Sequence, residues 1–117
     1  MSSIQQQMRK GTTTVVILKL LADEGVPMHG YQIIRQLEAQ SGGYFSFKEG
    51  LVYPRLHQLE REGLLSSEWE GKPGTRRRKV YRMTQDGLCR LAEELDQWRR
   101  LSSTLNQMLG VEQEQAG

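Results

Sequence analysis

The chain of 117 residues contains one cysteine, two histidines and three prolines, and it has no long apolar run. A single cysteine, Cys89, allows no internal disulfide, which favours a reducing compartment. No stretch reaches the roughly 18 apolar residues that a membrane-spanning helix needs, so no membrane partner is expected. The N-terminus has no apolar segment before a cleavage site, unlike a secretory signal. These absences favour one cytoplasmic domain with a modest core.

Residues that usually carry catalysis are equally sparse. His29 and His57 are the two histidines, and Cys89 is remote from both in the sequence. A zinc site needs several ligands at short regular spacings, and an activated nucleophile needs a base beside it. The sequence also has no glycine-rich phosphate loop. It therefore argues against an enzyme, and it predicts neither a metal site nor a cofactor.

Basic residues are unevenly distributed, although the net charge is only +2. Residues 71–82 contain no acid and six cations: Lys72, Arg76, Arg77, Arg78, Lys79 and Arg82. Acidic residues gather farther along, between Asp86 and Asp96. A nearly neutral total can hide a cationic face, so the composition is compatible with a polyanionic partner.

Apolar residues at helical spacing predict three helices in the first half of the chain. The first covers residues 12–23, and the polar residues 1–10 fit either a frayed end or the beginning of this helix. The second helix follows MHGYQIIRQLEAQ and stops at the Gly42-Gly43 pair. The third covers residues 50–62 and is closed by the next glycine. Three helices with short links predict a compact trihelical unit.

Two strands are predicted after the third helix. LLSSEWE and RRKVYRM have the alternating, β-branched and aromatic character of strands, and GKPGT between them is typical of a turn. A two-stranded hairpin is marginal alone and must pack on the helices. Three helices followed by two strands is the order of a winged helix-turn-helix. We therefore expect a mainly α fold with a small β-hairpin.

Residues 84–109 are predicted to form one long helix, with Thr84 as its N-cap. Apolar residues recur along it at spacings of three and four, as in a coiled coil: Leu88, Leu91, Leu95, Trp98, Leu101, Leu105 and Met108. Such a helix is roughly 39 Å long, which exceeds the trihelical unit, so we expect a second copy to cover the stripe. The chain then divides into a winged helix-turn-helix domain (1–83), a dimerisation helix (84–109) and a disordered polar tail (110–117).

The third predicted helix begins with Gly50 and carries Pro54, although both are poor helix formers. In a winged helix this helix enters the major groove of DNA with its N-terminal turn. Its outer face presents Gly50, Pro54 and His57, with Tyr53 on one flank and Lys48 just upstream. We expect these five residues to contact DNA and Pro54 to lie in about the first turn, where its missing N–H matters least. The alternative is a solvated face that touches nothing.

The predicted wing supplies a second set of candidate DNA contacts, Arg76, Arg77, Arg78 and Lys79. Cations on a wing can bind phosphates across the minor groove. Because alternate residues of a strand face the same way, about half of them are expected to face DNA. The others are expected to pair with Glu68 or Glu70 on the neighbouring strand.

The start of the second helix supplies a third set. His29 and Gly30 lie where free backbone N–H groups suit a phosphate. Tyr31 is either a phosphate contact through its hydroxyl or a core aromatic residue, and the sequence leaves both readings open.

Several of these motifs together resemble the PadR family of bacterial transcriptional regulators. They are MHGYQIIRQLE, EGLVYPRLHQLEREGLL, RRRKVYRMTQDG and a downstream tryptophan. The short single C-terminal helix is similar to that of the small subfamily. The resemblance implies a homodimer in which the C-terminal stripe packs on the partner's N-terminal helix, with Met8 in the interface. Leu51 and Val52 stand where the family usually has threonine and leucine, so a polar DNA-facing side chain is lost at Leu51 and base preference is expected to differ. Val80 replaces a residue that is often aromatic in the family.

Trp98 carries a further implication of this resemblance. In the multidrug-binding members a tryptophan at this place faces a pore at the dimer interface and stacks on flat ligands, which would make Trp98 an effector-binding residue. The alternative is an aromatic residue that only packs in the interface. The two roles are compatible.

We therefore expect a homodimeric repressor that binds double-stranded DNA at a pseudopalindromic operator in the nucleoid. A small hydrophobic or aromatic effector would release it. One alternative is a ligand-independent regulator with the same fold. Another is a winged helix for protein–protein contact, against which the basic wing argues because lysine is depleted in protein interfaces. The sequence predicts neither the operator nor the regulated genes.

Overall fold

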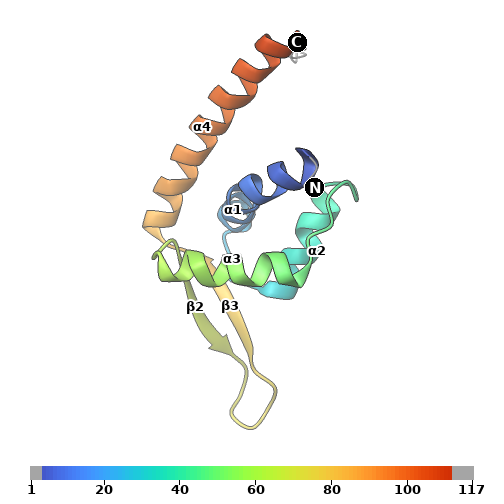
Figure 1. Ribbon diagram of the computed structural model, residues 1–117. Coiled ribbons are helices and arrows are strands. Elements are labelled where there is room, and N and C mark those ends of the chain that lie inside the picture. The colour runs from blue at the N-terminus through green and yellow to red at the C-terminus, as the bar shows by residue number, and fades with distance from the viewer. Residues whose placement is uncertain (1–3, 112–117) are drawn as a thin grey trace.

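The computed structural model describes residues 4–111, with side chains from Thr12 onward. Along this range the elements are α1 (Ile4–Glu24), β1 (Met28–His29), α2 (Gly30–Gln40), α3 (Glu49–Arg61), β2 (Leu65–Glu70), β3 (Arg78–Met83) and α4 (Gln85–Leu109). The predicted winged helix-turn-helix with a long last helix is confirmed. The β2–β3 wing and α4 leave the helical unit at opposite ends (Figure 1).

The first three helices enclose one hydrophobic core. Its buried residues repeat at helical spacing: Ile17, Leu18, Leu20 and Leu21 on α1, Ile33, Ile34 and Leu37 on α2, and Val52, Leu56 and Leu59 on α3. The buried residues of α3 belong to the apolar residues whose helical spacing predicted this helix. α1 begins at Ile4, so most of residues 1–10 belong to the first helix. Each buried aliphatic side chain contributes about 1.5–3 kcal/mol, so this core fixes α3 against α1 and α2.

The sheet has three antiparallel strands in the order β1–β3–β2, so the predicted two-stranded hairpin was incomplete. β1 consists of Met28 and His29, which pair with Tyr81 and Val80 of β3. Two residues are too few to show strand alternation in a sequence, and β1 is extended because β3 supplies its partners. As a result His29 belongs both to the sheet and to the beginning of α2.

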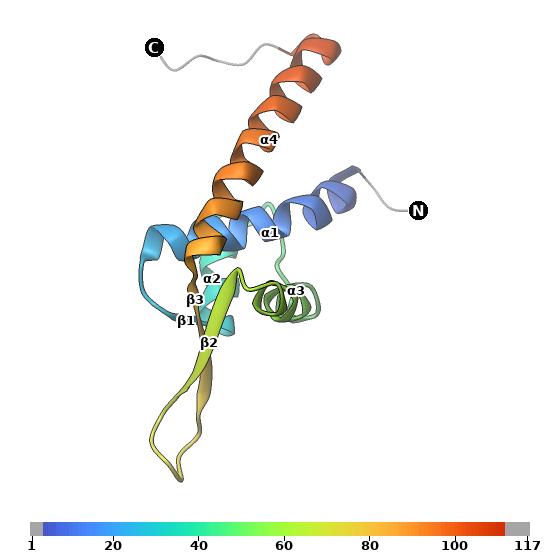
Figure 2. The ribbon, with the colours of Figure 1, turned by 90° about the vertical axis from the view of Figure 1, so that its left-hand side faces the viewer.

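The β2–β3 hairpin has the register Leu65↔Met83 to Glu70↔Arg78. Its core-side residues near the helices are buried, among them Leu65, Val80 and Tyr81. The connecting turn uses Gly71 and Gly74, both with positive φ, as the Gly/Pro composition predicts. Figure 2 shows the hairpin extending well beyond the helices, where its end can reach a partner.

α4 is attached to the core only over its first turns. The Thr84 hydroxyl accepts the N–H of Gly87 and lies 2.7 Å from the carbonyl oxygen of Gly63, as expected for an N-cap. Leu91 is buried in the core of the same chain, and Leu95 packs against it. Beyond Leu95 the helix projects away from the other elements (Figure 1) and ends at Gly110.

Candidate nucleic-acid interface

α3 presents the outer face that its sequence predicts. Val52, Leu56 and Leu59 are buried, whereas Gly50, Pro54 and His57 are exposed. α3 begins at Glu49, so Pro54 is not in the first turn as expected but in the second. Its ring nitrogen cannot donate to the carbonyl of Gly50, four residues earlier. α3 continues through this missing bond because Gly50 lies on the exposed face, where the carbonyl can meet water.

Tyr53 lies across the start of α2. A Cβ atom added to Gly30 would be 2.4 Å from Cε1 of Tyr53 and 2.8 Å from its hydroxyl oxygen. Distances this short mean that only glycine at position 30 permits this placement of the ring. Gly30 therefore positions Tyr53, and the phenol of α3 is held beside the first turn of α2.

His29 is the N-cap of α2. Its Nδ1 lies 3.2 Å from the backbone nitrogen of Gln32, and the Gln32 side chain accepts the backbone N–H of His29 at 3.0 Å. This reciprocal pair is a capping box. One of the backbone donors that the sequence offered to a phosphate is therefore already used by the cap.

The wing cations divide by their partners. Lys79 bonds Glu60 of α3 at 2.9 Å, and Glu60 also accepts the hydroxyl of Ser67 on β2. The expected partners on the neighbouring strand were wrong for Lys79, because its side chain points back to α3. Glu68 does form an ion pair, at 3.0 Å, but with Arg82, outside the four-residue cation run.

Arg78 extends from β3 to the start of α2, where its Nη1 lies 3.1 Å from Nε2 of His29. Arg76 and Arg77 are exposed, and within residues 4–111 they form no ion pair. None of these three arginines forms an ion pair with a described residue, so their N–H groups can bind phosphate.

Side chains from α2, α3 and the wing line one groove. Its residues are His29, Gly30, Tyr31, Glu49, Tyr53, His57, Trp69, Arg76, Arg77, Arg78, Lys79 and Tyr81. The structure thus brings together nine of the twelve candidate DNA contacts. Lys48, Gly50 and Pro54 lie outside the groove lining, at the exposed N-terminal part of α3. Tyr31 is 54% exposed and so is not a core residue.

Three lining residues, Glu49, Trp69 and Tyr81, were absent from the sequence-based prediction. Trp69 pairs with Lys79 in the hairpin, so both side chains stand on the α3 side of the wing, and the indole is 64% exposed there. Strand register would have revealed Trp69, because alternate residues share a face. Glu49 had no such signal.

Ionisation of the groove follows from these contacts. Burial, and then the charge of Arg78, lower the pKa of His29, which favours the neutral ring. Hydrogen bonds from Ser67 and Lys79 lower the pKa of Glu60, and the bond to Glu60 raises the pKa of Lys79. Burial raises the pKa of the Tyr81 phenol. The groove is therefore cationic at neutral pH, apart from Glu49 and the ion pair of Lys79.

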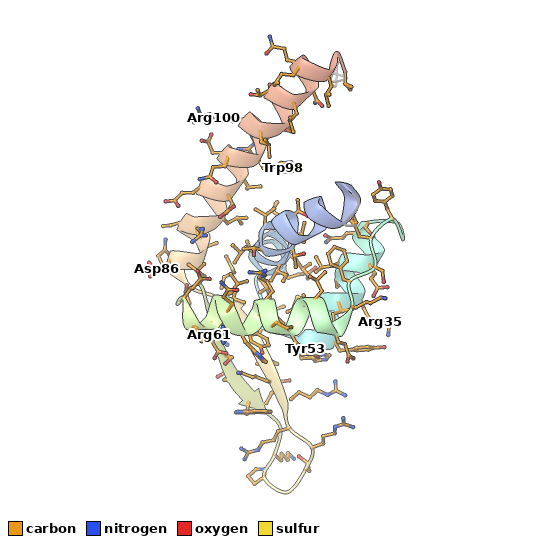
Figure 3. The ribbon with its side chains drawn as sticks, viewed as in Figure 1. Arg35, Tyr53, Arg61, Asp86, Trp98 and Arg100 are labelled. Carbon is orange, nitrogen blue, oxygen red and sulfur yellow. The ribbon has the colours of Figure 1, made fainter. Side chains whose placement is uncertain are left out.

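The predicted dimer stripe on α4 separates into two parts. Leu91 and Leu95 pack on the core of their own chain, whereas Leu88, Leu101, Leu105 and Met108 are exposed. Trp98 is 36% exposed and lies where α4 has left the helical unit (Figure 3). The side chain of Met8 lies outside the described residues.

Neither a metal-ligand cluster nor a membrane-spanning helix occurs in the described part of the chain. Between Ile4 and Val111 no group of three or more His, Cys, Asp or Glu side chains is arranged to hold a metal ion. Within the same range, no helix has the length and hydropathy to span a membrane.

Known proteins resemble this chain over most of its length. Residues 17–93 match a family profile described as the transcriptional regulator PadR-like family. The chain is 32% identical over 112 residues to the transcriptional regulator Rv3488 of Mycobacterium tuberculosis, and the match covers 96% of each protein. A PadR family transcriptional regulator from Eggerthella lenta has 33% identity and a TM-score of 0.77, covering 91% of this chain and 88% of that one. A PadR-like transcription factor from Bacteroides fragilis has 33% identity and a TM-score of 0.72, covering 92% and 99%.

Proposed function

The chain belongs to the PadR-like family of transcriptional regulators, and from this membership we propose that it is a repressor that binds a pseudopalindromic operator as a homodimer. We further propose that a small hydrophobic or aromatic effector releases it from DNA. The family makes the chain a DNA-binding regulator. Repression, the two-fold assembly and the effector are our inferences, and such a repressor would act at the nucleoid in the cytoplasm.

The groove between α3 and the wing carries the DNA-binding part of this function. Arg76, Arg77 and Arg78 of the wing are exposed in it, and α3 contributes the exposed His57 and the half-buried Tyr53. Cations fix a protein on the phosphate backbone, whereas donors on the recognition helix can read base edges. The groove is thus suited to a duplex whose major groove receives the N-terminal half of α3.

The distal half of α4 supports the homodimer. Leu101, Leu105, Met108 and Leu109 are all more than 40% exposed along the part of the helix that projects away from the helical unit (Figure 1). A contiguous apolar row of this kind is unfavourable in water and is typical of an interaction surface. In a two-fold dimer it would be covered, and two copies of α3 would face half-sites about 34–36 Å apart.

The proposed release by an effector depends on Trp98. Its indole is partly exposed near the middle of α4, between the attached and the projecting halves of the helix. Flat aromatic ligands gain about 0.5–1.5 kcal/mol from a stacked ring beyond the area that they bury. A ligand bound between two such indoles would release DNA if it favoured a dimer whose α3 helices no longer match the half-sites.

A selection experiment tests the repressor. The full chain would be used to select duplexes from a random library, and the enriched sequences should contain an inverted repeat with half-sites about one helical turn apart. A promoter that carries the selected site should be silenced when the chain is expressed. Enrichment of a single unrepeated site would contradict the homodimer, and enrichment of no site would contradict sequence-specific repression.

A further inference from the structure

His29 is contacted by hydrogen-bond donors on both of its ring nitrogens. The backbone N–H of Gln32 points at Nδ1, 3.2 Å away, and Nη1 of Arg78 lies 3.1 Å from Nε2. A neutral imidazole has one acceptor nitrogen, because the other carries the proton. It can accept from Gln32 or from Arg78, but not from both. One of the two contacts therefore places a donor against a donor.

The contact with Gln32 determines the tautomer. The Gln32 N–H is fixed by the geometry of α2. The reciprocal bond from the His29 backbone N–H to the Gln32 side chain holds the cap together, and with it the position of the imidazole. Arg78 is exposed on the wing and offers several N–H groups that can turn elsewhere. Nδ1 thus remains the acceptor and the proton lies on Nε2. Burial and the charge of Arg78 lower the pKa of His29, which keeps this neutral form.

An acceptor is therefore missing between His29 and Arg78. The Nε2–H of the imidazole and the guanidinium are directed at each other across 3.1 Å. Glu70, which lies opposite Arg78 in the hairpin and whose charge acts to raise the pKa of His29, forms no ion pair with Arg78 in the described chain. Tyr53 lies in the same groove, beside Gly30, and across residues 4–111 its hydroxyl makes no hydrogen bond. His29, Tyr53 and Arg78 thus offer donors to one groove from three separate parts of the fold.

We propose that a single phosphate of the DNA backbone binds at this place in the groove. It accepts from the Nε2–H of His29, from the guanidinium of Arg78 once this exposed side chain turns away from Nε2, and from the Tyr53 hydroxyl as a third donor. The inference rests on the DNA-binding function proposed above and specifies one phosphate group of that DNA. A phosphodiester has only acceptor oxygens and a negative charge, which suits three donors, whereas every base pair in the major groove is uncharged and presents a donor beside its acceptors.

Neutral His29 can serve this phosphate without losing its structural role. Nε2 donates to the phosphate while Nδ1 continues to cap α2, so binding requires no proton transfer. Arg78 adds the planar fork that matches two phosphate oxygens. Because His29, Tyr53 and Arg78 come from α2, α3 and β3, one phosphate would fix the recognition helix and the wing in a common register on the duplex.

The test combines protein variants with a phosphate scan. A duplex selected by the protein would be prepared with one neutral methylphosphonate at each backbone position of one half-site in turn. His29→Asp keeps an oxygen acceptor for the Gln32 N–H, since aspartate is a good N-cap, but has no donor for a phosphate. Arg78→Gln removes the guanidinium. Arg77→Gln is the matched control, because it removes the same charge from the neighbouring wing position.

One backbone position should respond differently from all others. For the parent protein, the methylphosphonate at that position should weaken binding by about 10- to 100-fold, as expected for hydrogen bonds to a charged group. For His29→Asp and Arg78→Gln the same methylphosphonate should cost at least several-fold less, and both variants should lose sensitivity at the same position. Arg77→Gln should bind DNA more weakly but keep the full loss at that position. Thermal unfolding should show that His29→Asp folds.

Two results would overturn this assignment. In the first, the parent binds its duplex with strong salt dependence while both variants keep every methylphosphonate effect of the parent. In that case the DNA-binding function is supported and the proposed phosphate site is wrong. If His29→Asp and Arg78→Gln lose sensitivity at different positions, the two side chains do not share a phosphate. If the parent binds no duplex at all, both the proposed function and the proposed phosphate site are wrong.

Imidazole nitrogen NMR provides a readout that a purely structural cap would not change. In the free protein at neutral pH, Nδ1 of His29 should have the chemical shift of an unprotonated nitrogen and Nε2 that of a protonated one. Addition of the unmodified duplex should shift the Nε2 signal, and the duplex with the methylphosphonate at the identified position should not. A protonated Nδ1 in the free protein would refute the donor–donor arrangement.

Discussion

The Tyr53 ring lies against the backbone of Gly30, so closely that a methyl group on Gly30 would be 2.4 Å from the ring. α2 and α3 thus meet at a point where one residue has no side chain and the other has a large one. The HGY and YP motifs, distant in the sequence, are complementary halves of this contact.

Gly30→Ala should therefore displace Tyr53 and lower the free energy of unfolding by about 1–3 kcal/mol, as overpacking typically does. In a Tyr53→Ala background the same substitution should be neutral or stabilising, because the clash is gone and alanine favours a helix. Urea denaturation of the four proteins gives the coupling energy. Additive effects would mean that the two residues do not share this space.

Glu60 should stabilise the joint between recognition helix and wing over a defined pH range. Its pKa is lowered in the folded chain, so its contribution is present above the unfolded carboxyl pKa of about 4.3 and is lost as pH falls through the folded value. The pKa of Lys79 is raised, so its contribution is present below its unfolded value and is lost as pH rises through the folded one.

Glu60→Gln should accordingly cost about 1 kcal/mol at neutral pH, and the difference from the parent should shrink in acid. Glu68→Gln breaks the more exposed pair with Arg82 and should cost less. Denaturant titrations between acid and neutral pH measure both. If Glu60→Gln lowers the free energy of unfolding by the same amount at all pH values, then packing and not charge stabilises the contact between α3 and the wing.

Arg76 and Arg77 should supply phosphate contacts without sequence preference, since both are exposed on the wing. Changing both to alanine should weaken selected and random duplexes alike. In a dimer it should reduce the slope of log affinity against log salt by up to about 3.6, at about 0.9 for each lost contact. Arg82→Ala, which removes a paired charge outside the groove, should change the slope much less. An unchanged slope in the double variant would remove these residues from the interface.

Local sequence patterns predicted the features that depend on one element. These features are α3 with its buried residues Val52, Leu56 and Leu59, the Thr84 cap and the two long strands. Each could be predicted because it follows from residue spacing or from a neighbour in the chain. β1 was missed because its extended form depends on β3, far along the sequence.

Partner choice was the main feature that the sequence did not specify. Lys79 pairs with Glu60 on α3 because the part of the hairpin nearest the helices lies beside α3, which no local rule indicates. Helical spacing likewise placed Leu91 and Trp98 in one stripe, yet Leu91 is covered by its own chain and Trp98 is partly open. Periodicity identifies an apolar face but not what covers it.

Gly87 should set the direction in which α4 leaves the core. A Cβ at this position would be 2.2 Å from the carbonyl oxygen of Leu64, a backbone atom that has little freedom to move. Gly87→Ala should lower the free energy of unfolding by about 1–3 kcal/mol or more. Gly50→Ala is the control, because open space surrounds that helical glycine and alanine should stabilise it by about 0.5–1 kcal/mol. Equal effects of the two substitutions in thermal unfolding would contradict the close contact.

Trp98 and Trp69 should report on different events, because they are the two tryptophans of the chain and lie on α4 and on the wing. Trp69, exposed in the groove, should respond to a duplex. Trp98 should respond to a flat cationic dye, since Asp96 is an exposed carboxylate near it in sequence. Glu94, two residues before Asp96, is paired with Arg90 at 2.8 Å, so its charge is partly compensated.

Fluorescence titrations of the parent and of Trp98→Phe separate these signals. The dye should quench the parent strongly and the variant weakly, whereas the duplex should quench both. The dye should also displace the duplex from the parent, because an effector acts only if it prefers the dimer form that DNA does not. Dye binding without DNA release would leave Trp98 as a ligand contact but reject its role in regulation. No dye quenching, combined with dissociation of the dimer by Trp98→Ala in sedimentation, would make Trp98 a packing residue and favour a ligand-independent regulator.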